Sequence, residues 1–172
     1  MEKQILVIVM GVSGTGKSSV GRNLAERKGW AFIEADDLHS KAAKAQMASG
    51  QPLDESIRAP WIDRICKALV ALRREEYSVV LACSALKRPH RDQFRSTAFP
   101  SCLFLFLNAD KEIIAERMTA RANHFMPASL LDSQFEALDW PTDEVDVVEI
   151  SVEKSLHEVI EEVEYEVGRV VG

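Results

Sequence analysis

Short runs of apolar residues recur along the chain, and longer stretches with apolar residues three or four positions apart separate them. The runs lie at residues 4–10, 30–35, 78–83, 102–107 and 145–150. The first run is almost continuously apolar and largely β-branched, which is typical of a strand buried on both faces. Because such strands alternate with helical stretches, the pattern predicts an α/β fold whose parallel sheet is covered by helices on both faces.

The stretches between these runs carry the period of helices. We expect helices at residues 18–28, 40–48, 54–72, 88–97, 110–121 and 152–167, with a further helix beginning at Pro127. The clearest one spaces its apolar residues at intervals of three and four: Ile57, Trp61, Ile65, Leu69 and Leu72. Asp54 precedes this stripe and is a good N-cap, while Gly50 and Pro52 are suited to ending the helix before it.

The composition indicates one acidic domain. A chain of 172 residues can bury a core of its own, and 21 basic against 27 acidic residues argue against a general nucleic-acid binder. Three cysteines (Cys66, Cys83 and Cys102) show no paired metal spacing, and their odd number predicts reduced thiols in a cytoplasmic protein. Residues 1–10 read as part of the fold rather than as a targeting peptide, and no apolar stretch approaches the ~20 residues that cross a membrane.

A phosphate-binding loop is the strongest motif of the chain. It consists of Gly11, Val12, Ser13, Gly14, Thr15, Gly16, Lys17 and Ser18, between a buried strand and a helix. The glycines let backbone amides approach and face the phosphates of ATP. Lys17 can reach the outer phosphates, and the Ser18 hydroxyl can ligate Mg²⁺. The alternative is a flexible turn that binds nothing.

Polar residues follow the second and third strands, at the edge where parallel sheets bind ligands. Asp36 comes directly after the second strand and could accept the proton of an attacking alcohol, with His39 close by. Alternatively, Asp36 or Asp37 only caps the next helix, and His39 lies on the surface. After the third strand, Lys87 begins a basic cluster and is the member that we expect at the site. The cluster contains Lys87, Arg88, His90, Arg91 and Arg95.

Three arginines are further candidates. Arg58 could hold a carboxylate through its planar fork, or could pair with Glu55 or Asp54. Arg117 and Arg121 are four positions apart and therefore share a helix face. They could stabilise the charge on a transferring phosphoryl group, or only complement the negative end of their helix. The irregular stretch after Arg121 favours a mobile lid that excludes water.

These features favour a kinase that acts on a small acceptor. The sequence contains no Asp-x-x-Gly and no Asn-Lys-x-Asp motif, so the usual apparatus of a guanine-nucleotide switch is missing. The chain is also short for a motor protein. The alternative from another class is a nucleotide-binding regulatory module that performs no chemistry.

Several segments complete a family pattern together with the phosphate loop. They lie at residues 36–39 (Asp-Asp-Leu-His), 47–53 (Met-Ala-Ser-Gly-Gln-Pro-Leu), 58–61 (Arg-Ala-Pro-Trp), 83–87 (Cys-Ser-Ala-Leu-Lys), 91–92 (Arg-Asp), 124–126 (His-Phe-Met) and 133–135 (Ser-Gln-Phe). In this order the segments resemble the small bacterial-type gluconokinases, which are P-loop kinases related to shikimate kinases and nucleoside monophosphate kinases. The Cys-Ser-Ala-Leu-Lys and His-Phe-Met segments are the most particular to that family.

The resemblance implies Mg²⁺-dependent transfer of the γ-phosphate of ATP to the 6-hydroxyl of D-gluconate. It also implies a three-layer P-loop kinase fold with five parallel strands and a small mobile lid, and usually a homodimer. Residues 1–172 would form one domain, with a substrate-binding helical segment at about 37–75 and the lid at about 121–138. The implied site residues are Lys17, Asp36 and Arg121 for catalysis, residues 11–18 and Arg117 for ATP, Ser18 for the metal, and Asp36, His39, Arg58, Lys87 and His124 for the substrate.

A kinase for another small acid such as shikimate, or for a nucleotide, is the nearest alternative. Shikimate kinases usually carry Asp-x-Asp after the second strand and a glycine run after the third. This chain instead has Asp36 and Asp37 adjacent, and Cys-Ser-Ala-Leu-Lys at residues 83–87. It departs from the gluconokinase pattern in the substrate and lid regions, at Ser40, Ala43, Ile57 and Asn123.

Overall fold

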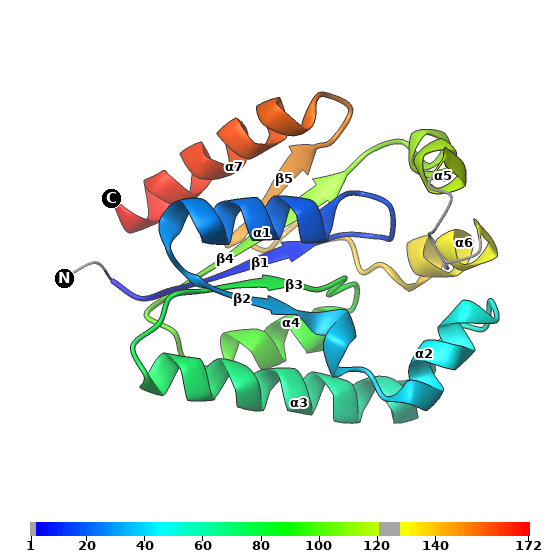
Figure 1. Ribbon diagram of the computed structural model, residues 1–172, viewed down its shortest axis with the longest axis horizontal. Coiled ribbons are helices and arrows are strands. Elements are labelled where there is room, and N and C mark those ends of the chain that lie inside the picture. The colour runs from blue at the N-terminus through cyan, green and yellow to red at the C-terminus, as the bar shows by residue number, and fades with distance from the viewer. Residues whose placement is uncertain (1–2, 121–127) are drawn as a thin grey trace.

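A five-stranded parallel sheet forms the centre of the computed structural model, which describes residues 3–120 and 128–172 (Figure 1). In chain order the strands are β1 (Ile5–Met10), β2 (Ala31–Glu34), β3 (Val79–Ala82), β4 (Ser101–Asn108) and β5 (Val147–Ser151). Their spatial order is β2-β3-β1-β4-β5, and all neighbouring strands are parallel. The fold class and the five strands predicted from the sequence are confirmed, and their bounds differ by at most two residues.

Helices cover both faces of the sheet and complete three layers (Figure 1). They are α1 (Lys17–Lys28), α2 (Lys41–Ala48), α3 (Glu55–Arg74), α4 (Arg88–Arg95), α5 (Lys111–Ala120), α6 (Ala128–Ala137) and α7 (Leu156–Val171), with a 3-10 helix η1 (Ala35–Leu38). The α1 and α7 helices lie on one face, and α3 and α4 lie on the other. Within the two described ranges, none of these helices is long and apolar enough to span a membrane.

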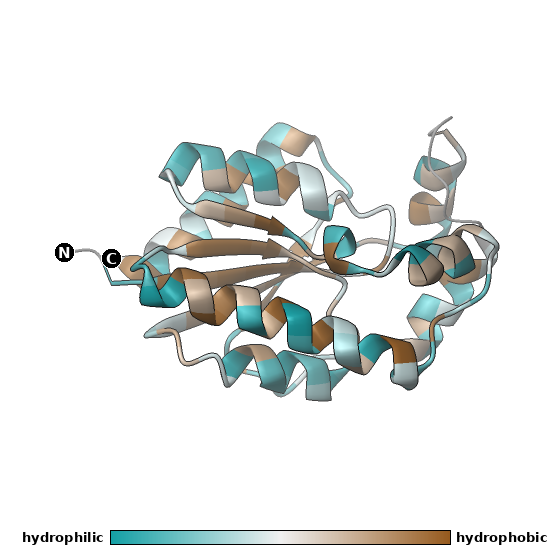
Figure 2. Ribbon diagram, turned by 60° about the horizontal axis from the view of Figure 1, so that its bottom comes forward, coloured by the Kyte–Doolittle hydropathy of each residue, from teal (hydrophilic) through white to brown (hydrophobic). Residues whose placement is uncertain are grey.

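Two apolar cores lie on the two sides of the sheet, and β1 contributes to both. Alternate residues of β1 pack toward α1 and α7, as Val7 does, or toward α3, as Ile8 does. Every residue of β1 is fully buried. The continuous apolar run seen in the sequence follows from this double coverage, and Figure 2 shows the apolar strands between more polar helices.

The carboxyl ends of the strands all point to the same edge of the sheet. The α2, α5 and α6 helices lie beyond this edge, whereas both termini lie at the opposite edge (Figure 1). Ligands bind at the carboxyl edge of open parallel sheets, so the residues that follow β1, β2 and β3 are brought together there. Arg121 and His124 lie outside the described residues.

Candidate active site

The phosphate loop links β1 to α1 and requires glycine at two close contacts. Gly11 has a φ of +140°, and a Cβ added there would lie 2.5 Å from the carbonyl oxygen of Leu107. Gly14 has a φ of +83°, and its Cβ would lie 2.8 Å from the side chain of Met118. Thr15 Oγ1 donates a hydrogen bond of 2.9 Å to the carbonyl oxygen of Val12 and closes the loop on itself. The loop therefore has the tight, glycine-dependent backbone that phosphate binding needs.

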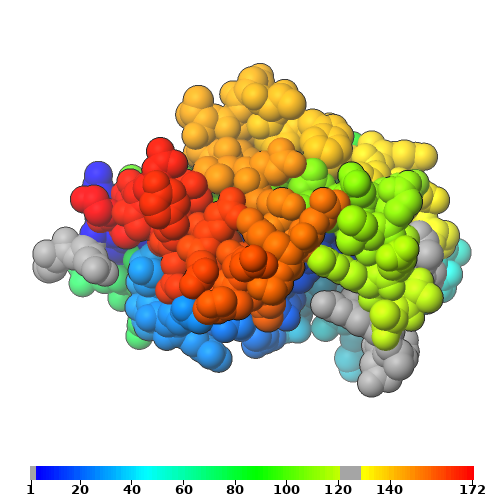
Figure 3. All heavy atoms as spheres, turned by 90° about the horizontal axis from the view of Figure 1, so that it is seen from above, coloured from blue at the N-terminus to red at the C-terminus, as the bar shows by residue number. Residues whose placement is uncertain are grey.

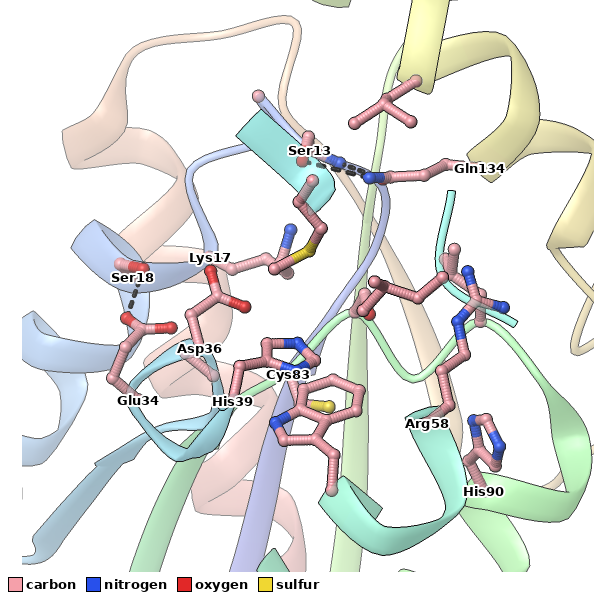
Figure 4. A pocket seen from close by; sticks show the side chains of 18 of the residues that line it. Ser13, Lys17, Ser18, Glu34, Asp36, His39, Arg58, Cys83, His90 and Gln134 are labelled. Atoms are coloured by element: carbon pink, nitrogen blue, oxygen red, sulfur yellow. Dashed lines mark hydrogen bonds between the residues drawn. The ribbon is translucent and has the colours of Figure 1, made fainter. Parts of the chain in front are cut away.

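Lys17 and Ser18 begin α1 and line a pocket at the carboxyl edge of the sheet (Figure 4). Lys17 Nζ donates a hydrogen bond of 3.0 Å to the carbonyl oxygen of Val12, so the ammonium group lies over the loop. Ser18 Oγ donates a hydrogen bond of 2.5 Å to Glu34 Oε2. Burial raises the pKa of Glu34, and the negative charge of Asp36 raises it further. The hydrogen bond from Ser18 acts in the opposite direction and lowers this pKa. Sequence reasoning missed Glu34, whose only signal is its place at the end of an apolar run.

Asp36 belongs to η1 and lines the same pocket. Ser40, not an aspartate, caps α2, because Ser40 Oγ accepts a hydrogen bond of 3.1 Å from the backbone N–H of Ala43. The alternative that Asp36 or Asp37 caps this helix is therefore wrong. Asp37 is exposed and does not line the pocket. Figure 4 shows Asp36 beside Lys17 and Ser18, on the side of the pocket where the phosphate loop lies.

His39 is buried in the pocket wall rather than on the surface. Its ring stacks on Trp61 with centroids 3.9 Å apart, and Trp61 Nε1 donates a hydrogen bond of 2.7 Å to the carbonyl oxygen of Ala35. Burial lowers the pKa of His39 to about 4, although the charge of Asp36 acts in the opposite direction. The imidazole is therefore neutral at pH 7. Its buried Nδ1 has no hydrogen-bond partner within the described chain.

Arg58 and Lys87 line the same pocket from α3 and from the loop after β3. Among the described residues, the guanidinium group of Arg58 forms no hydrogen bond or ion pair, and only the backbone N–H of Arg58 contacts Asp54, so the alternative pairing of its side chain with Asp54 or Glu55 is not observed. Glu55 instead contacts His90, with Oε1 2.8 Å from Nε2. Figure 4 shows Arg58 and His90 on the side of the pocket away from Lys17 and Asp36.

Arg91, another member of the basic cluster, supports the loop after β3. Arg91 is fully buried and forms a double hydrogen bond with Glu144, at 2.9 Å and 2.6 Å. It also donates to the carbonyl oxygens of Ala85 and Leu86 at 2.9 Å and 3.0 Å. Arg91 therefore fixes the segment that presents Lys87.

Arg117 lies beside a second hollow on the other side of the phosphate loop. Its Nη2 donates a hydrogen bond of 2.5 Å to the carbonyl oxygen of Val152. Gly16, Lys154 and Leu156 also line this hollow, where the segment after β5 lies beside α5 (Figure 3). The hollow adjoins the phosphate loop, which contributes Gly16, so an elongated ligand can extend from one to the other.

A further contact that sequence reasoning missed joins α6 to the phosphate loop. Gln134 Oε1 accepts a hydrogen bond of 2.7 Å from the backbone N–H of Ser13. Gln134 Nε2 lies 3.3 Å from Ser13 Oγ and donates to it. The Ser-Gln-Phe segment of the family pattern is the only sequence signal for this residue.

Comparisons with known proteins identify the family of this chain. A family model described as "AAA domain" matches residues 6–141. The gluconokinase of Gluconobacter oxydans is 42% identical over 160 residues, which cover 93% of this chain and 89% of that protein. The thermosensitive gluconokinase of Escherichia coli is 41% identical, with 90% and 83% covered.

A solved structure gives the same result in three dimensions. The crystal structure of a gluconokinase from Sinorhizobium meliloti superposes with a TM-score of 0.89 at 40% identity, covering 99% of this chain and 95% of that one. Identity at this level over nearly the whole chain indicates common descent as well as a common fold. The chain therefore belongs to the AAA-domain group of P-loop proteins and, within it, to the gluconokinase family.

Proposed function

We propose that the protein transfers the γ-phosphoryl group of ATP to the 6-hydroxyl of D-gluconate. One observation carries the proposal: a single pocket is lined by phosphate-loop residues and Asp36 on one side and by Arg58 on the other. D-Gluconate has a hydroxyl at one end of its carbon chain and a carboxylate at the other. The pocket offers a group suited to each end, and the gluconokinase relatives make this acid the first candidate.

ATP binds with its phosphates on the loop of residues 11–18, where the backbone amides and the α1 dipole favour anions. Lys17 contacts the outer phosphates and neutralises the charge that develops during transfer. The hollow beside Arg117 lies next to the loop and takes the nucleoside part. Leu156, which is 49% exposed, supplies an apolar surface there for the base.

The oxygen atoms beside the loop fit Mg²⁺. Ser18 Oγ and the Glu34 carboxylate form a hydrogen-bonded pair of hard oxygen donors next to Lys17. Mg²⁺ in kinases is held by one or two such protein groups together with phosphate oxygens and water. Ser18 would hold the ion directly and Glu34 would orient Ser18. When bound, the ion supplies positive charge to the β- and γ-phosphates.

Asp36 addresses the acceptor hydroxyl. Its carboxylate accepts the proton of the 6-hydroxyl while the oxygen forms a bond to the γ-phosphorus and the bond from that phosphorus to the leaving oxygen of ADP breaks. The neutral His39 offers a hydrogen bond to another hydroxyl of the acid. Arg58 and Lys87 bind the carboxylate at the far end, because a guanidinium fork matches two carboxylate oxygens.

The remaining assignments rest on the sequence. Arg121 stabilises the charge on the transferring phosphoryl group, and His124 contacts the substrate. Residues 1–172 form one domain, with a substrate-binding segment at about 37–75 and a lid at about 121–138. The protein acts in the cytoplasm as a homodimer.

The test is a substrate panel. ADP release is measured with ATP, Mg²⁺ and either D-gluconate, shikimate or a nucleoside monophosphate, and the product is identified by mass spectrometry. We expect rapid ADP release and 6-phospho-D-gluconate only with D-gluconate. Faster phosphorylation of shikimate or of a nucleotide would reassign the substrate, and ADP release that no acceptor stimulates would favour a regulatory module.

A further inference from the structure

Gln134 joins α6 to the phosphate loop through both ends of its carboxamide (Figure 4). The carboxamide accepts from the backbone N–H of Ser13 at 2.7 Å and donates to the hydroxyl of the same residue at 3.3 Å. Because the backbone N–H is a donor only, Oε1 must face it and Nε2 must face the hydroxyl. A planar carboxamide supplies an acceptor and a donor side by side, and neither glutamate nor methionine does.

The contact lies at the wall of the reaction pocket. Leu130, Ser133 and Gln134 of α6 line the pocket together with Lys17 and Asp36. A hydrogen bond from this wall to the loop therefore fixes the position of α6 relative to the phosphates.

Packing makes α6 a firm support for this bond. Leu130 and Leu131 are 3% and 1% exposed, and Leu131 belongs to the same apolar core as Ile114 and Met118 of α5. The loop also rests on α5, since a Cβ at Gly14 would meet the Met118 side chain at 2.8 Å. The phosphate loop, α5 and α6 are thus in mutual contact. Gln134 supplies a polar link between the phosphate loop and α6.

We propose that Gln134 is a positioning residue that holds α6 across the phosphate loop and so keeps water from attacking the γ-phosphate. The inference rests on the proposed kinase function. Water can form the same oxygen–phosphorus bond as the sugar hydroxyl, breaking the bond to ADP and releasing inorganic phosphate and a proton. A neutral carboxamide serves this purpose beside ATP, because a carboxylate in its place would repel the phosphates.

Three variants test the proposal. Gln134→Met keeps the length and removes both hydrogen bonds, and Gln134→Glu keeps the acceptor but adds a charge. Glu136→Gln is the matched control, because Glu136 is exposed on the same helix and does not line the pocket. ADP and 6-phospho-D-gluconate are measured in the same reaction, and thermal unfolding is followed separately.

We expect the loss of Gln134 to uncouple ATP hydrolysis from phosphorylation of the acceptor. In Gln134→Met we expect kcat to fall about tenfold, from the loss of two hydrogen bonds, and the ADP released per phosphorylated product to rise above the wild-type value. Gln134→Glu should in addition raise the KM for ATP, and Glu136→Gln should match the wild type. If the ratio of ADP to product in Gln134→Met equals that of the wild type, the proposal is overturned, even where the melting temperature or kcat falls.

A second measurement does not depend on the acceptor. Hydrogen–deuterium exchange of the amides of residues 128–137 is compared with and without a non-hydrolysable ATP analogue. Exchange in the presence of the analogue should be faster in Gln134→Met than in the wild type and in Glu136→Gln, and equal exchange in all three contradicts the proposal. If the wild type fails to phosphorylate D-gluconate, the proposed function fails, while this comparison still tests the role of Gln134.

Discussion

Ser18 Oγ donates a hydrogen bond of 2.5 Å to Glu34 Oε2, which joins the first turn of α1 to the last residue of β2. The bond fixes the rotamer of the hydroxyl that is expected to face the metal. Burial raises the pKa of Glu34, so the folded protein binds a proton at this carboxyl more tightly than the unfolded chain does. The stability that Glu34 contributes is therefore present at low pH and is lost as the pH rises through the raised pKa.

Glu34→Gln should consequently lower kcat without lowering the melting temperature at pH 8. Glutamine keeps an acceptor for Ser18 but has no charge, so we expect kcat to fall about 10–100-fold, the usual cost of losing a group that orients a metal ligand. At pH 8 the variant should melt slightly above the wild type, by less than about 4 °C, and the difference should shrink at pH 4. Steady-state kinetics and thermal unfolding at both pH values check this, and a variant that melts lower at pH 8 would contradict it.

Lys17→Ala should abolish most turnover without changing the fold. The ammonium group lies over the phosphate loop, where it donates a hydrogen bond to the carbonyl oxygen of Val12. Its loss leaves the charge on the transferring phosphoryl group without neutralisation, at an expected cost of about 10²–10³-fold in kcat. Circular dichroism and coupled kinetics measure the two effects, and wild-type turnover would mean that the loop does not act in phosphoryl transfer.

Glu144→Gln should destabilise the protein. Glu144 accepts hydrogen bonds from the fully buried Arg91, and also from Arg95 at 2.7 Å. Removing its charge leaves the Arg91 charge buried without its partner, which costs about 3 kcal/mol in the free energy of unfolding. Asp143→Asn is the control, since its pair with Arg88 is exposed and 3.4 Å long and contributes less than about 1 kcal/mol.

The same pair predicts a dependence on pH. Hydrogen bonds from Arg91, and then those from Arg95, lower the pKa of Glu144 to about 2. A lowered pKa means that the stabilisation is present above the ordinary carboxyl range and is lost as the pH falls through about 2. Urea unfolding at pH 7, 4 and 2.5 should therefore show the difference between wild type and Glu144→Gln narrowing at the lowest pH. A constant difference would show that charge does not stabilise this pair.

Structural features that depend on residues close together in the chain can be predicted from the sequence. Contacts between residues far apart in the chain cannot. The strands, the phosphate loop and the place of Asp36 follow from local patterns, because burial on both faces and the backbone needs of the loop act on consecutive residues. Only Lys87 of the basic cluster is expected at the site from the sequence, and nothing in the local pattern predicts that Arg91 is fully buried. The burial of Arg91 depends on its pairing with Glu144, which is 53 positions away in the chain. No pattern of neighbouring residues indicates such a pair.

Long-range contacts also explain why two site residues, Gln134 and Glu34, could not be identified from the sequence. Gln134 meets Ser13 across 121 positions, and its role follows from the approach of α6 rather than from its neighbours in the chain. Glu34 ends an apolar run as many strand-terminal residues do, and only the hydrogen bond from Ser18 distinguishes it.

Arg117 and Arg121 should differ in which kinetic constant they control. Arg117 is held by the carbonyl oxygen of Val152 beside the second hollow, so Arg117→Ala should mainly raise the KM for ATP. Arg121 is four positions later in the sequence, outside the described residues, and is expected to act on the transferring phosphoryl group. Arg121→Ala should therefore lower kcat more than it raises the KM for D-gluconate. If both variants have the kinetic constants of the wild type, the alternative holds that the two arginines only complement the negative end of the helix dipole.

Asp36→Asn should fold normally, bind ATP and lose about 10²–10⁴-fold in kcat, the range for a positioned acid or base. Asparagine keeps the shape of the side chain but is a poor proton acceptor. Asp37→Asn is the matched control: Asp37 is the next residue of η1, is exposed and does not line the pocket, so its variant should keep wild-type kcat and melting temperature. A structural role would give the opposite pattern for Asp36→Asn, with early melting and undiminished turnover. That result would mean that another group orients the hydroxyl.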